Sequence, residues 1–290
     1  MSNEKSTTTH NLKVYKDTKQ FWLATSSQLK QEEAKNSLFL GVSYIFTSNP
    51  TNCIYQSALF QGDQLLGALM CSKVQTHYNI LVSPVNNKQT AEELLKQAQK
   101  SNTPINNIIG ENITVEQYKK ILSELGKETQ LTMTQGIYKC TKVIPPAIPK
   151  EITFRLATQN DVSTIAKWIE YFHIDATPHK PPIDCLNIAK NKIEKKSIFV
   201  IESNGEPVSM AASARDLETS CSVNSVFTPR KFRKKGYGSI VTALLTQHLF
   251  DSGKKEINLY TDMKNPTSNK IYQDIGYELV CNSTHITVKS

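Results

Sequence analysis

The chain has 290 residues, of which 39% are apolar and 21% charged, and its formal net charge is +8. This length is long for one compact domain and comfortable for two, and the composition is ordinary for a globular protein. No apolar run approaches the length of a membrane span, and the N-terminus lacks the apolar core of a signal peptide, so we expect a cytoplasmic protein without a membrane partner.

The first half of the chain is predicted to form an α/β domain behind a polar tail. Residues 1–12 are polar, and we expect them to be disordered. A helical pattern follows over 21–35, and the apolar segment 38–46 fits either a helix or a strand. Apolar periodicity and turn residues then predict the order strand, strand, strand, helix, strand, helix, strand at 53–60, 65–73, 78–82, 88–100, 105–109, 114–125 and 131–143.

A proline-rich segment at 145–150 is the clearest linker in the chain. Pro145, Pro146 and Pro149 favour a stiff, extended backbone. The linker separates a first domain over 13–144 from a second over 151–290. The element order of the first domain parallels that of the second, which suggests two copies of one fold.

The second domain is predicted to mix helices and strands in the same way. Thr158 and Asp161 are suited to cap a helix over 162–172, and a loop with three prolines follows over 173–182. The other expected elements are strands at 152–157, 197–202, 207–214, 220–227 and 256–261, a helix at 183–195, a helix through 240–249 that stops at Gly253, and a short helix from Pro266 to Gly276.

The segment between the strand at 220–227 and the helix that follows it is suited to bind phosphate groups. Thr228-Pro229 ends the strand, and five cations lie within 230–235. Gly236 and Gly238 then allow the backbone to approach an anion closely where the helix begins. The first turn of a helix has N–H groups without partners and a partial positive charge, so this site suits a diphosphate.

Two motifs resemble those of the Gcn5-related N-acetyltransferase (GNAT) family. Arg233–Gly238 reads R-x-x-G-x-G and is similar to the acyl-CoA pyrophosphate loop of that family. Residues 265–277 read N-x-x-S-x-x-I-Y-x-x-I-G-Y and look like the family's penultimate helix, in which a tyrosine lies near the thioester sulfur. The resemblance implies an α/β fold of two GNAT-like domains. Each would be a mixed, mostly antiparallel sheet flanked by helices, with a splayed pair of parallel strands. The loop after 78–82 has neither the glycine pair nor the arginine, so the first domain is expected to be a degenerate copy that binds no acyl-CoA.

The resemblance also implies an acetyl-CoA-dependent N-acetyltransferase that transfers an acetyl group directly to a primary amine of a small molecule or peptide. Tyr272 is the expected general acid. The residues expected to bind acetyl-CoA are Val226, Phe227, Thr228, Arg233, Lys234, Lys235, Gly236, Tyr237, Gly238, Ser239, Asn265 and Asn269. No general base is assigned, because Ser222 and Asn224, the residues in phase on the strand before the loop, do not take a proton at neutral pH. The substrate candidates are Trp168, Tyr171, Phe172 and Asn224, with His173 and His179 beside them.

Two other functions remain open at this point. A non-catalytic acyl-CoA-binding protein would have the same loop without turnover. The basic cluster at 230–235 would also suit nucleic acid, but it lacks the interleaved aromatic residues of a stacking surface, so we expect no nucleic-acid partner. The cysteines and histidines show no metal-ligand spacing, so we expect no metal. The protein is expected to be a monomer or homodimer.

Overall fold

The computed structural model describes residues 10–176 and 184–289, and its contacts divide the chain into two compact units. The first unit runs to Ile137 and also includes 262–264 and the chain from Val280 onward. The second unit consists of 138–261 and 265–279. This division differs from the predicted boundaries, because the segment at 145–150 lies inside the second unit and the last strand lies in the first.

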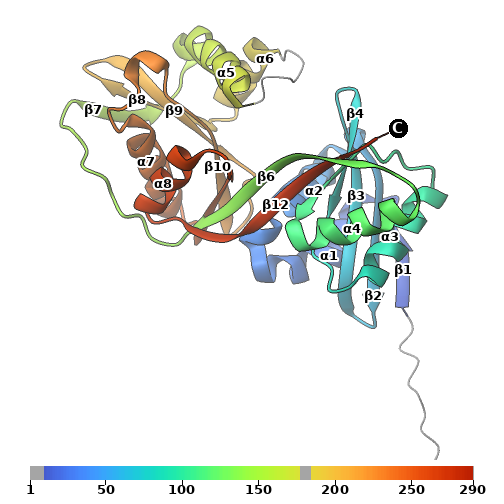
Figure 1. Ribbon diagram of the computed structural model, residues 1–290. Coiled ribbons are helices and arrows are strands. Elements are labelled where there is room, and N and C mark those ends of the chain that lie inside the picture. The colour runs from blue at the N-terminus through green and yellow to red at the C-terminus, as the bar shows by residue number, and fades with distance from the viewer. Residues whose placement is uncertain (1–9, 177–183, 290) are drawn as a thin grey trace, which may run out of the picture. The chain divides into compact units, whose positions relative to one another are not determined.

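The first unit is a sheet covered by helices (Figure 1). Its elements are β1 (His10–Val14), α1 (Thr18–Leu29), α2 (Glu33–Ser48), β2 (Cys53–Gln61), β3 (Gln64–Val74), β4 (His77–Val82), α3 (Lys88–Lys100), β5 (Asn107–Glu111), α4 (Asn112–Glu124), most of β6 (Thr129–Cys140) and most of β12 (Glu278–Val288). The strands follow the order β1-β2-β3-β4-β5-β12-β6. β4 and β5 form a parallel pair, and their neighbours β3 and β12 pair with them antiparallel.

Helices α3 and α4 of this unit form because each has a continuous apolar face. Leu94, Leu95 and Ala98 of α3 are fully buried in one cluster with Tyr118 and Ile121 of α4. The prediction of a disordered tail over 1–12 is wrong for its last three residues. His10, Asn11 and Leu12 belong to β1, which pairs with β2. The remaining tail residues, 1–9, lie outside the described residues, and the ambiguous segment 38–46 is helical.

The second unit contains the predicted diphosphate loop. Its elements are β7 (Ile152–Leu156), α5 (Val162–Ala176), α6 (Cys185–Glu194), β8 (Ile198–Ser203), β9 (Glu206–Ala214), β10 (Ser220–Phe227), α7 (Tyr237–Asp251), β11 (Glu256–Asp262) and α8 (Pro266–Asp274). The strands follow the order β11-β10-β9-β8-β7. Here β10 and β11 are parallel, and the other three pairs are antiparallel.

The two faces of the second sheet have separate cores. Cys221, Val223, Ile257 and Leu259 pack with α7 and α8 on one face. Met210 and Ala212 of β9 pack with α5 and α6 on the other. Figure 1 shows α5 and α6 on one side of these strands and α7 and α8 on the other. Strand alternation therefore places Ser222, Asn224, Asn258 and Tyr260 on the face of α5 and α6. The predicted fold class is confirmed, because each unit has a mixed, mostly antiparallel sheet with one parallel pair and flanking helices.

The last strand completes the sheet of the first unit rather than that of the second. Ser283–Thr287 of β12 pairs antiparallel with Asn107–Glu111 of β5, and Ile286 is fully buried in the core of the first unit. The first and last described strands, β1 and β12, thus belong to the same unit, and the residues of the second unit lie between them in the sequence.

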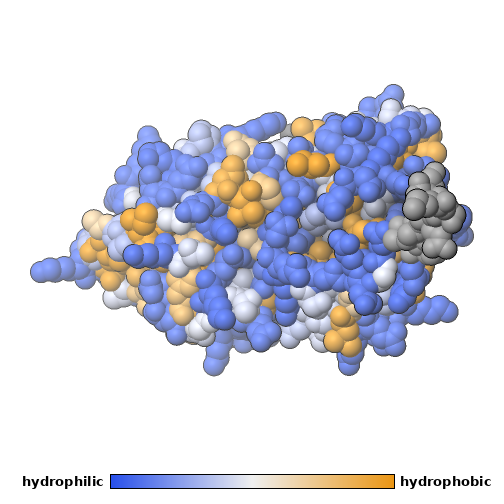
Figure 2. Space-filling model, turned by 90° about the horizontal axis from the view of Figure 1, so that it is seen from below, coloured by the Kyte–Doolittle hydropathy of each residue, from blue (hydrophilic) through white to orange (hydrophobic). Residues whose placement is uncertain are grey.

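The described residues contain no helix long and apolar enough to cross a membrane. Figure 2 shows one face of the molecule, on which hydrophilic residues dominate and hydrophobic residues form small separate groups.

Candidate functional site

β10 separates from its parallel partner halfway along its length. Ser220–Val223 pairs with Glu256–Leu259, but β10 continues to Phe227 and β11 to Asp262. On the other side, the pairing with β9 is interrupted after Asn224 by an extra residue in β10, a β-bulge. Ser225 at this bulge has a φ of 50°, a left-handed conformation that is uncommon for a residue with a side chain. The bulge turns β10 away from β11 and frees part of its backbone.

The chain then enters α7 through a short loop. Lys234 and Gly236 have φ values of 64° and 79°, and Gly236 occupies the N-cap position of α7 without a side-chain cap. The amide groups of the first turn therefore have no side-chain acceptor from the N-cap residue. A Cβ atom at Gly236 would meet nothing within 4 Å, and one at Gly238 would lie 3.7 Å from Thr228 Oγ1. An uncapped helix start with open space before it fits a diphosphate.

The corresponding helix of the first unit begins differently. Asn87 caps α3, because its side-chain oxygen accepts a hydrogen bond from Thr90 N at 2.9 Å. Val85 N donates to Thr114 Oγ1, and the Val85 side chain is buried in the core. These amide groups already have hydrogen-bond partners, so fewer free N–H groups are available to bind an anion here than at the start of α7.

The cations of the loop fall into two groups. Arg233 donates to the carboxylate of Asp175 in α5 at 2.7 Å and to Thr228 O at 2.9 Å, and Arg230 also pairs with Asp175. By contrast, Lys234 and Lys235 are exposed and form no ion pair with a described residue. The lysines are thus available to an anion at the start of α7, whereas Arg233 would first have to leave Asp175.

The residues before the loop contribute mainly through their backbone. Phe227 is buried against the core of α5 and α6, and Val226 packs against the core on the other face. The Thr228 hydroxyl lies 2.8 Å from Ser209 Oγ, and its carbonyl accepts the bond from Arg233. Tyr237, Gly238 and Ser239 are half-buried in the first turn of α7.

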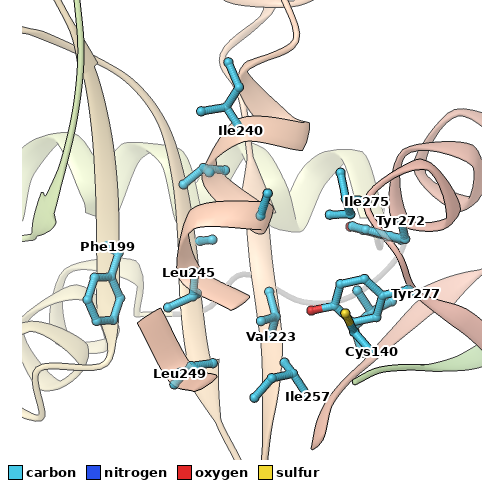
Figure 3. Packing of buried hydrophobic residues seen from close by; sticks show 14 of the residues in the cluster. Cys140, Phe199, Val223, Ile240, Leu245, Leu249, Ile257, Tyr272, Ile275 and Tyr277 are labelled. Carbon is cyan, nitrogen blue, oxygen red and sulfur yellow. The ribbon is translucent and has the colours of Figure 1, made fainter. Parts of the chain in front are cut away.

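Helix α8 carries the predicted proton donor. Asn265 caps this helix, because its side-chain oxygen accepts a hydrogen bond from Ser268 N at 3.1 Å. Asn269 follows one turn later and is half-buried. Tyr272 is 9% exposed, and Figure 3 shows it beside Ile275 with Tyr277 below. Burial raises the pKa of Tyr272 to about 12, so the phenol is protonated at neutral pH.

The substrate candidates of α5 lie in different environments. Trp168 is buried and Phe172 half-buried in the core between α5, α6 and the sheet, so both are packing residues. Tyr171 is 41% exposed, and Lys167 Nζ lies over its ring, 5.8 Å from the ring centroid. His173 lies inside α5 rather than in a loop, and His179 lies outside the described residues.

Sequence reasoning missed Arg215, in the turn between β9 and β10. Its Nε donates to Ser222 Oγ at 2.9 Å, and its guanidinium lies 4.7 Å from the ring centroid of Tyr260. Burial lowers the pKa of Arg215 below its usual value, although an arginine remains charged. No motif marks this residue, and only strand alternation, which places Ser222 and Asn258 on one face, indicates a polar surface here.

A model of the acetyltransferase (GNAT) family matches residues 164–277. No curated protein sequence matches the chain significantly. Among solved structures, a GCN5-related N-acetyltransferase from Sphaerobacter thermophilus is similar with a TM-score of 0.63 and 10% identity, over 97% of this chain and 95% of that one.

Two further structures show the same likeness. A GNAT-family acetyltransferase from Colwellia psychrerythraea has a TM-score of 0.57 and 13% identity, over 97% of this chain and 100% of that one. A tandem GNAT protein from the clavulanic acid biosynthesis pathway has a TM-score of 0.61 and 8% identity, over 96% of this chain and 98% of that one. At these identities the likeness concerns the fold, and the family match covers α5 to α8. Residues 164–277 of the second unit thus match the acetyltransferase (GNAT) family model, and the chain has, over nearly its whole length, the fold of these GNAT structures.

Proposed function

We propose that the protein is an acetyl-CoA-dependent N-acetyltransferase that acetylates a primary amine of a small molecule or peptide by direct transfer. The observation that carries this proposal is the start of α7. An uncapped helix N-terminus with a left-handed Gly236 follows a strand that has left its parallel partner. The corresponding α3 of the first unit is capped by Asn87, so only the second unit is proposed to bind the coenzyme.

The chain's own residues would hold acetyl-CoA from two sides. The amide groups of Gly238 and Ser239, with the ammonium groups of Lys234 and Lys235, are suited to the diphosphate. The backbone of β10 between Asn224 and Thr228 is suited to pair with the pantetheine arm like an added strand. When bound, the thioester supplies an activated acetyl group.

Tyr272 is proposed to deliver a proton to the departing thiolate. Its raised pKa keeps the proton on the phenol at neutral pH. Tyr272 lies on α8 and is the tyrosine of the motif at 265–277 that resembles the family's penultimate helix. One backbone N–H of the bulged part of β10 is proposed to donate to the acetyl oxygen, a type of contact worth about 2.7–4 kcal/mol. Solvent is the proposed route for the proton that leaves the amine, because Ser222 and Asn224 cannot accept it.

The rival function is that of an acyl-CoA-binding protein without turnover. The ion pair between Arg233 and Asp175 and the depth of Tyr272 in the core are the observations that favour it. Both functions include acetyl-CoA binding, so binding alone does not separate them.

The test is a screen of primary amines with purified full-length protein and acetyl-CoA, with thiol release as the readout and acetyl-CoA binding measured by calorimetry. We expect micromolar binding and thiol release with at least one amine. Binding without release for any amine would favour the rival function. Absence of binding would overturn both.

A further inference from the structure

A polar cluster, partly buried, lies on the α5–α6 face of the second sheet, at the point where β10 and β11 separate. We name it the Arg215 cluster, and it consists of Arg215, Ser222, Asn258 and Tyr260. Ser222 and Asn258 lie opposite each other in the parallel register, and both are fully buried. The paired part of β10 and β11 ends one residue further on, so the cluster borders the proposed path of the pantetheine arm.

The hydrogen bonds of this cluster run in one direction. Arg215 Nε donates to Ser222 Oγ, and the Ser222 hydroxyl donates to Asn258 Oδ1. The other end of the Asn258 amide, the donor Nδ2, is buried and has no hydrogen-bond partner. Arg215 is half-buried, and the hydrogen bond of its guanidinium to Ser222 comes from Nε, so the Nη groups are open to a ligand. The guanidinium of Arg215 also lies over the ring of Tyr260, 4.7 Å from its centroid, which favours this placement of the side chain.

The charge of Arg215 is not balanced within the described part of the chain. No described carboxylate forms a salt bridge with it, and its neighbour in sequence, Asp216, pairs instead with Lys254 at 2.6 Å. A half-buried cation beside a fully buried, unpartnered amide donor is unfavourable unless an anion binds there. Arg215 also has a φ of 48°, so its backbone is held in a conformation that residues with side chains rarely adopt.

Asn224 adds the opposite kind of group. It follows Ser222 by two residues on the same face of β10, and its side-chain oxygen is buried without a hydrogen-bond partner. The surface thus presents a positive charge at Arg215 and a hydrogen-bond donor at Asn258. Asn224, two residues beyond Ser222 on the same face of β10, presents a hydrogen-bond acceptor. An amine with a carboxylate a few atoms away complements both.

We propose that the Arg215 cluster and Asn224 form the acceptor site and that the acceptor is an amino carboxylate. Its carboxylate binds Arg215 Nη and Asn258 Nδ2, and its amine donates to Asn224 Oδ1. A carboxylate fits better than a phosphate, because its single charge equals that of the one guanidinium and its two oxygens match the guanidinium fork. This inference rests on the proposed acetyltransferase function and specifies its substrate class.

The first test compares matched acceptors on the unaltered protein. L-amino acids are assayed beside their primary amides, which keep the amine and side chain but lack the carboxylate. Because leaving one partner of a buried charge pair unmatched costs 2–5 kcal/mol, we expect kcat/KM to be about 30-fold or more higher for the best amino acid than for its amide. Calorimetric titration of the same pairs into the complex with CoA, which does not react, should show the same preference in Kd.

The second test changes the protein. Arg215→Gln should abolish the preference for the amino acid over its amide, and Arg215→Lys should retain part of it, while acetyl-CoA binding stays unchanged in both. The control is Lys120→Gln, which removes an exposed cation from α4 of the first unit and should leave the preference intact. If Arg215→Gln fails to fold, the comparison of amino acids with amides on the unaltered protein still tests whether the acceptor is an amino carboxylate.

The outcomes separate this inference from the proposed function. Thiol release with equal kcat/KM for amino acids and amides, or only with amines that lack a carboxylate, would overturn the acceptor assignment and leave the acetyltransferase function standing. Absence of acetyl-CoA binding would overturn both. A preference that survives in Arg215→Gln would also overturn the assignment to this cluster.

Discussion

At the scale of single residues, Tyr272 is both a core residue and the proposed proton donor. Its ring packs against that of Tyr277 with centroids 6.1 Å apart, and burial keeps its phenol protonated. A phenylalanine at this position would retain the packing of the ring and remove only the hydroxyl group that carries the proton.

Tyr272→Phe should therefore lower kcat by about 10²–10⁴-fold, the usual contribution of general acid catalysis, with little change in acetyl-CoA binding. Turnover with an acceptor from the amine screen and calorimetry on the same preparation measure the two effects. An unchanged kcat would remove Tyr272 from the mechanism and leave it as a packing residue.

Gly276 shows a second constraint at this scale. It has a φ of 101°, and a Cβ atom there would lie 2.5 Å from Lys142 O. Gly276→Ala should thus destabilise the protein by more than about 1 kcal/mol, because both the backbone conformation and the contact oppose it. The matched control is Gly253→Ala, where φ is 98° but a Cβ atom would meet nothing within 4 Å. Urea unfolding should show a larger loss for Gly276→Ala than for Gly253→Ala, and equal losses would contradict the steric argument.

At the scale of elements, the corner between β7 and α5 is held by one buried carboxylate. Asp161 accepts two hydrogen bonds from Arg155, at 2.8 and 3.0 Å, and completes a capping box with Thr158, as the sequence predicted. The hydrogen bonds from Arg155, with those from Thr158, hold the pKa of Asp161 below its usual value. Because the folded-state pKa is depressed, the stabilisation is present above the unfolded value of about 3.9 and is lost as the pH falls through the folded value.

Asp161→Asn should therefore reduce the free energy of unfolding at pH 7 by about 2 kcal/mol, the typical value of a hydrogen bond to a charged group. The difference between the two proteins should shrink as the pH is lowered below about 4. Urea unfolding at a series of pH values measures it. A difference that stays constant down to pH 3 would show that the charge of Asp161 contributes nothing.

At the scale of the whole molecule, the pairing of β12 with β5 makes the first unit depend on a segment near the C-terminal end of the chain. Ile286 of β12 is fully buried in the core of the first unit, whereas Leu279 at the start of the same strand is 47% exposed. Ile286→Ala should cost about 2–5 kcal/mol, and Leu279→Ala should cost little. Hydrogen exchange should place the loss of protection for Ile286→Ala in β4 and β5. A loss confined to β10 and β11 would contradict the pairing.

Much of the fold follows from sequence periodicity, and its limits have physical causes. The hairpins and α3 were predictable because alternating or helical apolar patterns end at turn and capping residues. The segment 38–46 was ambiguous, because α2 has apolar residues on its exposed face as well, such as Tyr44 and Ile45. The pairing of β12 with β5 was not predictable, because the apolar pattern of a strand is the same whichever sheet it joins.

The candidate site divides in the same way. The loop at Gly236 and the capped start of α8 could be predicted, because both use local backbone geometry that a short motif encodes. Arg215 could not, because its contacts with Ser222 and Tyr260 depend on how a turn folds back over a neighbouring strand. The partner of Arg233 was also missed, since Asp175 lies 58 residues away in the sequence.

The central claim is that the first turn of α7 binds the diphosphate of acetyl-CoA, and a calorimetric titration of one variant tests it most directly. Gly238→Asp adds a carboxylate to that turn, where it favours the helix dipole, and its Cβ atom would make only an ordinary contact with Thr228. The matched control is Gln89→Asp, the second residue of α3 in the first unit.

We predict that Gly238→Asp stays as stable as the unaltered protein but loses acetyl-CoA binding, while Gln89→Asp binds normally. Unchanged binding in Gly238→Asp, or its loss in Gln89→Asp, would contradict the account.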